Sequence, residues 1–344
     1  MREQVANLGS DFLFPKLHGR WAQAWAGAAL LRLVQAGSSD AIGRLLAPLG
    51  IEVTQRPDVQ RQLLRRHIAE LSAVRRLADP GTARFYGAFL DRHFYDDLKT
   101  LLHYRYFPEQ EVDIAVLLVA APELPHLDAA ALLGARNAPE FLSRLPEHPC
   151  RAALLPLLVE VEGSHDLLAA DGHLDRVFYA ALLGATAGLP AGPRTRARRL
   201  VQTEIDTTNL VMVLRNLLLY RLPAAAMCRR CLPGGQLLDP PLLEALIARP
   251  DRGSLIAALP PPYRSLLEPF VAAELYVSEN ALWDRLYGLA QADFSDYDHP
   301  AASLVAFAFL KRFETLNIGR VCEGVHFGLS TASILGMMIG AGHV

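Results

Sequence analysis

The stretch that decides the fold reads Asp206-Thr207-Thr208-Asn209-Leu210-Val211-Met212-Val213-Leu214-Arg215. The run from Leu210 to Leu214 is apolar on every side of a helix, so we expect this helix to be largely buried. Arg215 comes nine residues after Asp206 and therefore lies on the opposite face, out of reach of the acid within one helix. A buried carboxylate is tolerated only when it is paired or hydrogen-bonded. We therefore predict acid-to-arginine contacts between neighbouring helices, which would fix how those helices pack.

The same pattern, an acid followed three positions later by a polar residue and then by apolar residues, recurs twice. One copy is Asp96-Asp97-Leu98-Lys99-Thr100-Leu101-Leu102, continuing to Arg105, and the other is Glu314-Thr315-Leu316-Asn317-Ile318-Gly319-Arg320. Lys99 stands where the other copies have asparagine, and Glu323 stands nine residues after the third acid in place of an arginine. The predicted inter-helix polar residues are Asp96, Lys99, Arg105, Asp206, Asn209, Arg215, Glu314, Asn317 and Arg320.

A second pattern recurs with a similar period. Two short apolar segments flank a polar turn at residues 29–45, 131–145 and 242–259. This arrangement is typical of one short helix followed directly by another. Two copies follow the first two acid motifs, and the remaining copy lies near the N-terminus. There it would complete the third unit if the units closed in a ring.

Proline and glycine mark the ends of the long helices. We expect helices at about 59–78, 82–106, 194–220 and 300–325, with breaks at 146–149, 188–193, 260–262 and 294–299. The apolar run 325–341 approaches the length of a membrane span, but His326, Ser330 and Thr331 interrupt it, so we expect a buried terminal helix. The sequence predicts an all-α fold of three related units: 51–148, 149–262, and 263–344 completed by 1–50.

Composition excludes several classes of function. The 344 residues are 51% apolar and carry a formal net charge of −2, which argues against a general nucleic-acid binder. The four cysteines are too scattered for a disulfide framework, so a reducing cytoplasm is expected.

Motifs that would carry catalysis or a cofactor are weak. Cys228-Arg229-Arg230-Cys231 has the spacing of half a zinc site, but no second cysteine pair follows, so structural thiols are expected. Glu323-Gly324-Val325-His326 is the single Glu-x-x-His string, and a di-metal bundle needs two. No Gly-Lys-Ser/Thr phosphate loop occurs, nor a Gly-x-Ser-x-Gly nucleophile turn. We therefore predict no catalytic residue, no metal and no cofactor.

One basic cluster stands at the start of a predicted helix, where positive charge is unfavourable. It consists of Arg194, Arg196, Arg198 and Arg199. The cluster could face an acidic patch on a partner or lipid headgroups, although solvated charge is the plainer interpretation.

The strings Asp206 to Arg215, Phe313 to Arg320 and Gly324 to Ser330 resemble a stalk component of the V-type ATPases and ATP synthases, known as C in archaeal and bacterial enzymes and as d in eukaryotic ones. The resemblance covers nearly the whole chain in order and spacing. It implies three similar helical bundles arranged as a funnel around a pseudo-threefold axis, on the cytoplasmic face of the membrane. It also implies a non-catalytic part of the rotor, peripheral to the membrane and monomeric within its complex.

The resemblance further implies which partners the chain has. Members of this family receive the end of the central shaft and couple it to the membrane ring of proteolipid subunits that carry protons or sodium ions. An alternative from a different class is a stand-alone helical scaffold or assembly factor for another complex. A helical metalloenzyme is a third class, and it would need the clustered carboxylate and histidine ligands that the motifs do not supply.

Overall fold

Helices make up the regular secondary structure of the described part of the chain. The computed structural model describes residues 2–53, 56–107, 113–164 and 166–340, and within these ranges the chain forms helices and no strand. None of the helices in these ranges combines the length and the apolar character that crossing a bilayer demands. The all-α prediction is confirmed.

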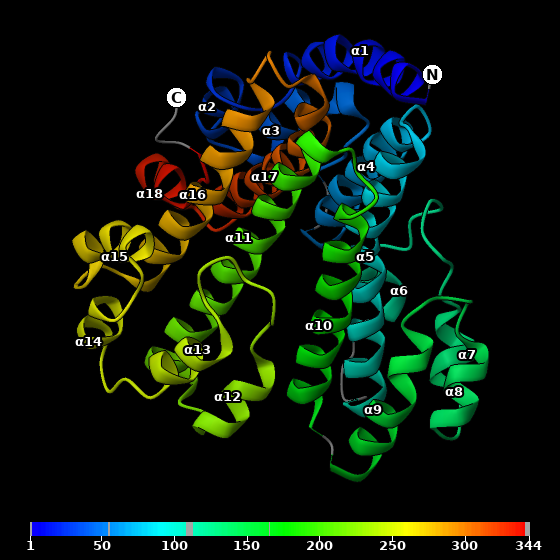
Figure 1. The fold of residues 1–344 in the computed structure, drawn as a ribbon, viewed down its shortest axis with the longest axis vertical. Coiled ribbons are helices and arrows are strands. Elements are labelled where there is room, and N and C mark those ends of the chain that lie inside the picture. Colours follow the sequence, from blue (N-terminus) through cyan, green and yellow to red (C-terminus); the bar gives the residue numbers. More distant parts are fainter. Residues whose placement is uncertain (1, 54–55, 108–112, 165, 341–344) are drawn as a thin grey trace.

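Three helical hairpins form the centre of the molecule (Figure 1). They are α4 (Arg56–Arg75) with α5 (Pro80–Tyr106), α10 (Leu167–Thr186) with α11 (Ala191–Arg215), and α16 (Leu275–Phe294) with α17 (Pro300–His326). Within each hairpin the two helices pack together, and α5 also packs on α10, α11 on α16, and α17 on α4. The six helices therefore contact one another in a closed cyclic order.

The predicted long helices agree closely with these elements, with one difference. The helix expected over 194–220 is α-helical only to Arg215 and continues as the π-helical turn η2 (Asn216–Tyr220), after which Arg221 adopts a left-handed conformation. The expected terminal helix is also divided. Residues 325–326 end α17, and α18 (Thr331–Met337) follows, with Ile334, Met338 and Ile339 buried.

Three pairs of short helices correspond to the second sequence pattern. They are α2 (Ala28–Val34) with α3 (Ser39–Leu46), α7 (Ala129–Leu133) with α8 (Ala138–Arg144), and α13 (Pro240–Ile247) with α14 (Arg252–Ala257). In each pair a polar side chain from the turn, Ser38, Asn137 or Asp251, accepts a hydrogen bond from a backbone N–H in the first turn of the second helix. This N-cap is the reason that the polar turn divides two helices.

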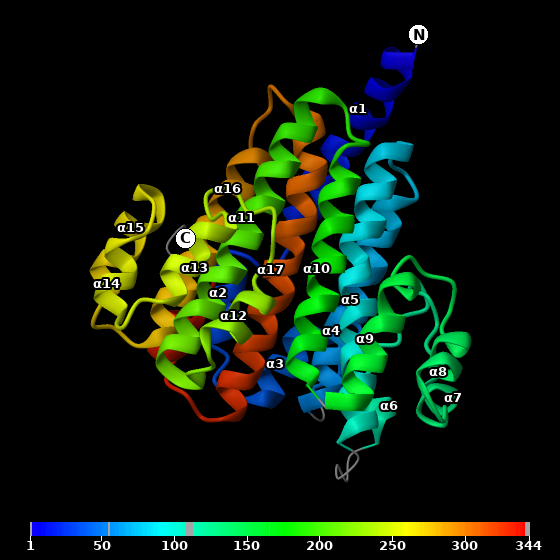
Figure 2. The ribbon, with the colours of Figure 1, turned by 60° about the horizontal axis from the view of Figure 1, so that its bottom comes forward.

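The remaining elements lie around the hairpins (Figure 2). They are α1 (Arg2–Trp21), η1 (Ala47–Leu49), α6 (Ile114–Leu117), α9 (Arg151–Ser164), α12 (Ala224–Arg230), α15 (Pro261–Leu267) and η3 (Glu268–Phe270). Although they are far apart in sequence, the N-terminal helices α2 and α3 both pack on α17, and α2 also packs on α18. Leu33 and Ile42 lie in one hydrophobic cluster with Val321 and Ile334.

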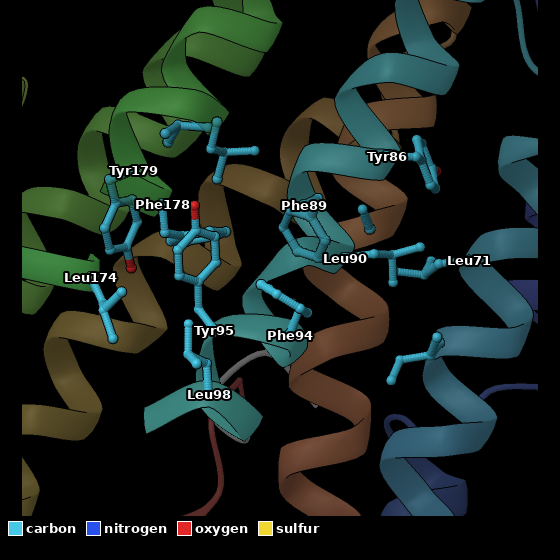
Figure 3. Packing of buried hydrophobic residues seen from close by; sticks show 14 of the residues in the cluster. Leu71, Tyr86, Phe89, Leu90, Phe94, Tyr95, Leu98, Leu174, Phe178 and Tyr179 are labelled. Atoms are coloured by element: carbon cyan, nitrogen blue, oxygen red, sulfur yellow. The ribbon is translucent and has the colours of Figure 1, made fainter. Parts of the chain in front are cut away.

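Aromatic side chains of α5 hold that helix to its neighbours (Figure 3). The ring centroids of Phe89 and Phe309 in α17 are 5.1 Å apart, and those of Tyr95 and Phe178 in α10 are 5.8 Å apart. Phe89 and Tyr95 are almost fully buried. Burying an aromatic or aliphatic side chain of this size stabilises the fold by about 1.5–3 kcal/mol.

The first turn of α5 lies against the turn that joins α10 to α11. A Cβ atom added at Gly81 would lie 2.2 Å from the backbone oxygen of Gly188, so the two segments approach too closely for any side chain at Gly81. We predict that Gly81→Ala lowers the free energy of unfolding by about 1–3 kcal/mol through overpacking.

Gly184→Ala is the matched control, because this helical glycine of α10 is exposed and has nothing within 4 Å of its added Cβ. It should raise stability by about 0.5–1 kcal/mol, since alanine is the better helix former. Denaturant unfolding of both variants measures the difference. Equal effects of the two substitutions would contradict the close approach.

Candidate functional site: the central helix junction

A buried ion-pair triad joins the three long helices that follow the hairpin turns. Arg92 of α5 and Arg312 of α17 each place Nη1 2.7 Å from Oε1 of Glu204 in α11, and Arg92 Nη2 lies 3.3 Å from Oε2. The Glu204 side chain is fully buried, and those of Arg92 and Arg312 are 11% and 17% exposed. One carboxylate therefore connects all three helices.

Aromatic groups surround the triad. The Tyr179 hydroxyl of α10 donates a hydrogen bond to Glu204 Oε1 over 3.1 Å. The Arg92 guanidinium lies 5.0 Å from the ring centroids of both Phe89 and Phe178, and that of Arg312 lies 5.4 Å from Trp283. Stacked rings exclude water on the faces of the guanidinium groups while leaving their N–H groups free to bind the carboxylate.

The electrostatics of the triad follow from its burial. Burial alone would raise the pKa of Glu204, but Arg92 and Arg312 outweigh it and hold that pKa below its ordinary value. Burial, followed by the repulsion from Arg92, lowers the pKa of Arg312. For Arg92 burial acts in the same direction, yet the nearby Glu204 carboxylate raises its pKa. All three groups are expected to be charged at neutral pH.

The molecule opens to solvent one helical turn beyond the triad, toward the C-terminal ends of the three helices. The residues four positions after the triad are Asp96, whose side chain is 56% exposed, the partly buried Thr208, and Leu316, which is 38% exposed. Although Asp96 is exposed, desolvation by the surrounding protein raises its pKa.

The surface of α5 beyond the triad is polar. An open pocket of about 370 Å³ lies there, lined by Asp96, Lys99, Thr100, His103, Tyr104 and Leu117. Lys99 and His103 pair with Asp175 and Asp171 of α10. Figure 1 shows α11 diverging from α5 and α10 toward its C-terminal end.

Each of the three long helices also fastens the backbone that follows it, through a buried polar side chain five residues after the triad position. Asn209 accepts a hydrogen bond from the N–H of Leu232 and donates one to its carbonyl oxygen. Asn317 makes the same two bonds with Ile339. In α5 the Asp97 carboxylate accepts bonds from the N–H groups of Val119 and Ala120. We call Asp97, Asn209 and Asn317 the backbone clamps.

The clamps correct the register of the sequence pattern. The pattern aligns Lys99 with Asn209 and Asn317, but the residue that makes the corresponding contact is Asp97, two positions earlier. Lys99 instead pairs with Asp175 and, at 3.9 Å, with Asp96. The physical reason is that a clamp must point at a buried backbone segment, whereas an ammonium group at Lys99 stays partly in solvent.

Asp206 is satisfied by groups other than the expected arginine. Its carboxylate accepts hydrogen bonds from the backbone N–H groups of Gln236, Leu237 and Leu238 and from the Tyr263 hydroxyl. Burial raises its pKa, and these hydrogen bonds oppose the rise. A Cβ added at Gly235 would lie 2.0 Å from Asp206 Oδ1, so the loop approaches the acid closely because it carries glycine there.

The remaining predicted arginines reach neighbouring segments in different ways. Arg215 pairs with Glu279 of α16 through Nε and Nη2, at 2.6 and 2.7 Å. Arg105 donates to the backbone oxygens of Leu132 and Leu133, and Arg320 donates to Asn280 and to the backbone oxygen of Met337. An acid-to-arginine contact between helices is therefore made at Arg215, whereas Arg105 and Arg320 bind backbone and amide oxygens.

Glu314 joins the N-terminal segment to α17. It pairs with Lys311 one turn earlier and accepts a hydrogen bond of 2.7 Å from the backbone N–H of Trp25. Lys311 also pairs with Glu70 of α4 at 2.9 Å. The third acid motif thus contributes to an inter-helix contact, with a lysine rather than an arginine as its cation.

The basic cluster at the start of α11 is largely used within the molecule. Arg196 and Arg199 both pair with Asp293 in the last turn of α16, and Arg196 also pairs with Asp296 just after that helix. Arg194 donates to the backbone oxygen of Leu189, and Arg198 is exposed. Arg196 and Arg199 therefore fasten α11 to α16.

Sequence reasoning missed the triad itself. Arg92, Glu204 and Arg312 carry opposite charges at equivalent positions, so a search for identical residues cannot detect them. Each of the three stands five residues before a clamp on a long, largely buried helix. A charged residue at that position of a buried helix is the signal that could have found them. Among the described residues, no group of three or more His, Cys, Asp or Glu side chains is placed to hold a metal ion. The ion pairs at the junction fix α5, α11 and α17 relative to one another.

Comparison with known proteins points to one family. The family model described as the ATP synthase (C/AC39) subunit matches residues 27–337. A curated relative, the C subunit of the A-type ATP synthase of Methanosarcina barkeri (strain Fusaro / DSM 804), is 28% identical over 132 residues. That match covers 37% of this chain and 34% of the relative, so the chain spans about a third of the length of the curated relative it matches.

We predict that Glu204→Gln lowers the free energy of unfolding by about 3–5 kcal/mol, because it leaves two buried guanidinium groups without a carboxylate. Since the pKa of folded Glu204 is lowered, this stabilisation is present above the unfolded pKa of about 4.3 and is lost as the pH falls through the folded value. The difference between wild type and variant should therefore shrink in acid. Urea unfolding at several pH values measures it.

Asp175→Asn is the matched control for the triad, because it removes a partly exposed carboxylate that pairs with Lys99 between α10 and α5. It should cost about 1 kcal/mol or less. If the two variants were equally stable, the triad would not be the central constraint.

The clamps generate a separate prediction. Asn209→Asp and Asn317→Asp each remove the amide donor and place a carboxylate oxygen against a backbone carbonyl, so each should cost about 1–3 kcal/mol. Hydrogen exchange should accelerate at Leu232 and Ile339 respectively.

Asn137→Asp is the control for the clamps, because it alters an N-cap at which aspartate serves equally well. Its stability should stay within about 0.5 kcal/mol of wild type. Unchanged exchange at Leu232 in Asn209→Asp would contradict the clamp.

Proposed function

The chain belongs to the ATP synthase (C/AC39) subunit family, and from this membership we propose that it is a non-catalytic central-stalk component of a V-type or A-type rotary ATPase. In this role it couples the central shaft to the membrane ring of proteolipid subunits, which carry protons or sodium ions. The observation that carries the proposal is the family match over nearly the whole chain. The chain works at the cytoplasmic face as a peripheral, monomeric member of that complex and has no active site of its own.

We propose that the chain is a funnel of three related units around a pseudo-threefold axis. The units are residues 51–148, residues 149–262, and residues 263–344 completed by 1–50. Two observations support this proposal: the cyclic packing order of the three hairpins, and the three clamps at equal spacing from Arg92, Glu204 and Arg312. The axis would pass through the triad.

We propose that a hollow lies beyond the triad, between α5, α11 and α17, and that it receives the end of the shaft. Its walls differ: α5 presents the Asp96 carboxylate, α11 presents Thr208, and α17 presents the apolar Leu316. A shaft end seated there would meet a charged wall on one side and an apolar wall on another. Such a seat would hold the shaft in one rotational position.

A torque-transmitting protein must resist twisting between its units. Buried, hydrogen-bonded charge pairs resist sliding, because any displacement leaves an uncompensated charge in a medium of low dielectric constant. Arg92 and Arg312, both bound to Glu204, supply that resistance on the proposed axis. The exposed Arg198 remains available for an acidic partner or for lipid headgroups.

We predict that the chain co-purifies with shaft subunits and the proteolipid ring, and that the isolated chain does not hydrolyse ATP. Leu316→Asp, on the wall of the hollow, should weaken capture of the shaft subunits at least about tenfold, because it places a charge against an apolar contact. Pull-down from co-expressed subunits measures the capture.

Val159→Asp is the control for this experiment, because Val159 is 57% exposed on α9, outside the hollow. It should capture shaft subunits as wild type does. Capture that is unaffected by Leu316→Asp would remove the hollow from the proposal, and ATP turnover by the pure chain would overturn the proposal itself.

A further inference from the structure

Cys228 and Cys231 lie at one end of α12, away from the central junction. Cys228 is in the last turn of the helix, and the N–H of Cys231 still donates to the backbone oxygens of Met227 and Cys228. Cys231 has φ of −58°, which keeps its Cβ on the helical path. Residues three apart on a helix have Cβ atoms about 5–6 Å apart on one face. The two thiols therefore point to the same side.

Both thiols line one open pocket. The pocket has a volume of about 440 Å³ and is also lined by Arg176, Leu232, Pro233 and Glu244. Both cysteines are partly exposed, so a ligand can reach them. The other two cysteines differ from this pair: Cys150 is buried in the main core, and Cys322 packs against the cluster of α2, α3 and α17.

Three contacts hold the backbone around the pair. Asn209 fixes Leu232, directly after Cys231, through both its N–H and its carbonyl oxygen. Arg176 of α10 donates to the backbone oxygen of Arg229. A Cβ added at Gly172 would lie 3.2 Å from the Cα of Arg230, so α10 and α12 are in close backbone contact. The spacing of the two cysteines is therefore fixed before any ligand binds.

This spacing disfavours a disulfide. A disulfide needs Cβ atoms about 3.5–4.5 Å apart, closer than a helical pair three residues apart. Bringing the atoms together would require the last turn of α12 to shift against the Asn209 clamp. A metal ion between the two sulfur atoms spans the wider gap without that movement.

We propose that Cys228 and Cys231 form a two-coordinate site for a soft monovalent metal ion, with Cu(I) as the ion that the ligands select. Thiolate ligands favour Cu(I), whereas Zn²⁺ takes four ligands in a structural site. The described residues place no third His, Cys, Asp or Glu in a metal-binding group with these two. Binding replaces two S–H bonds by two Cu–S bonds and releases two protons, so the bound site carries one negative charge.

Two arginines near the pair favour that charge, and burial opposes it. Burial, together with the neighbouring Cys228, raises the pKa of the Cys231 thiol to about 11, while Arg176 and Arg230 act in the opposite direction. The same arginines would stabilise the negative bis-thiolate complex. Because protons leave on binding, affinity for Cu(I) should rise between about pH 6 and pH 8.

The test titrates the full chain, reduced and without oxygen, with Cu(I) in competition with bicinchoninate. We expect one Cu(I) per chain, loss of this binding in Cys228→Ser and in Cys231→Ser, and full binding in the control Cys322→Ala. Arg176→Gln should lower affinity about tenfold, as removal of an outer-shell partner does. X-ray absorption at the copper edge should report two sulfur neighbours.

Several results would overturn the site. They are no competition with bicinchoninate by the wild type, undiminished binding in the double variant Cys228→Ser/Cys231→Ser, or nitrogen and oxygen neighbours at the copper. Thermal melting of each serine variant must match that of the apo wild type, so that loss of binding reports the ligands rather than the fold. The site is independent of the proposed rotor role, and failure of one leaves the other standing.

Discussion

The Glu204 carboxylate, bound by Arg92 and Arg312, is the interaction on which the rest of the structure depends. Removing ions of this kind from water costs several kcal/mol each, and the cost is offset only when all partners are in place. The triad therefore contributes more to the specificity of helix packing than to its stability. The helices α5, α11 and α17 must align at one position along their lengths, because a helix displaced by one turn would leave a charge unpaired. Apolar packing, as at Phe89 and Phe309, tolerates such a shift far better.

The triad fixes the position of each helix along its axis, and the clamps fix the backbone segments that follow the helices. Asp97, Asn209 and Asn317 stand five residues further along and hold backbone segments that begin 22 or 23 residues later. Each long helix thus positions a backbone segment that follows it in the chain. The inner faces, at Asp96 and Leu316, stay uncovered. The triad and the clamps thus act on different parts of the fold: the triad on the packing of the helices, the clamps on the segments that follow them.

Much of the fold could be predicted from the sequence because it depends on local signals. Proline at the first position of α17, caps at Ser38, Asn137 and Asp251, and apolar periodicity determine helices without reference to the rest of the chain. The site could be predicted only in part. The sequence pattern identifies Asn209 and Asn317 but misplaces Asp97 by two residues, because it requires an acid followed by a polar residue. The partners of Asp206 could not be found, since most of them are backbone N–H groups, which do not depend on the identity of the residue.

The chemical difference between the three triad positions has a consequence for symmetry. If all three positions carried arginine, three buried cations would repel one another, and if all carried glutamate, three buried anions would do the same. A junction built from related units can hold charge at its centre only when the units differ there. Arg92 and Arg312 flank Glu204, and Asp96 adds a second negative charge one turn away, which balances the two arginines. The three hairpins therefore cannot exchange places around the junction. The triad fixes their order, and the unlike side chains one turn further on, Asp96, Thr208 and Leu316, continue that asymmetry toward the solvent.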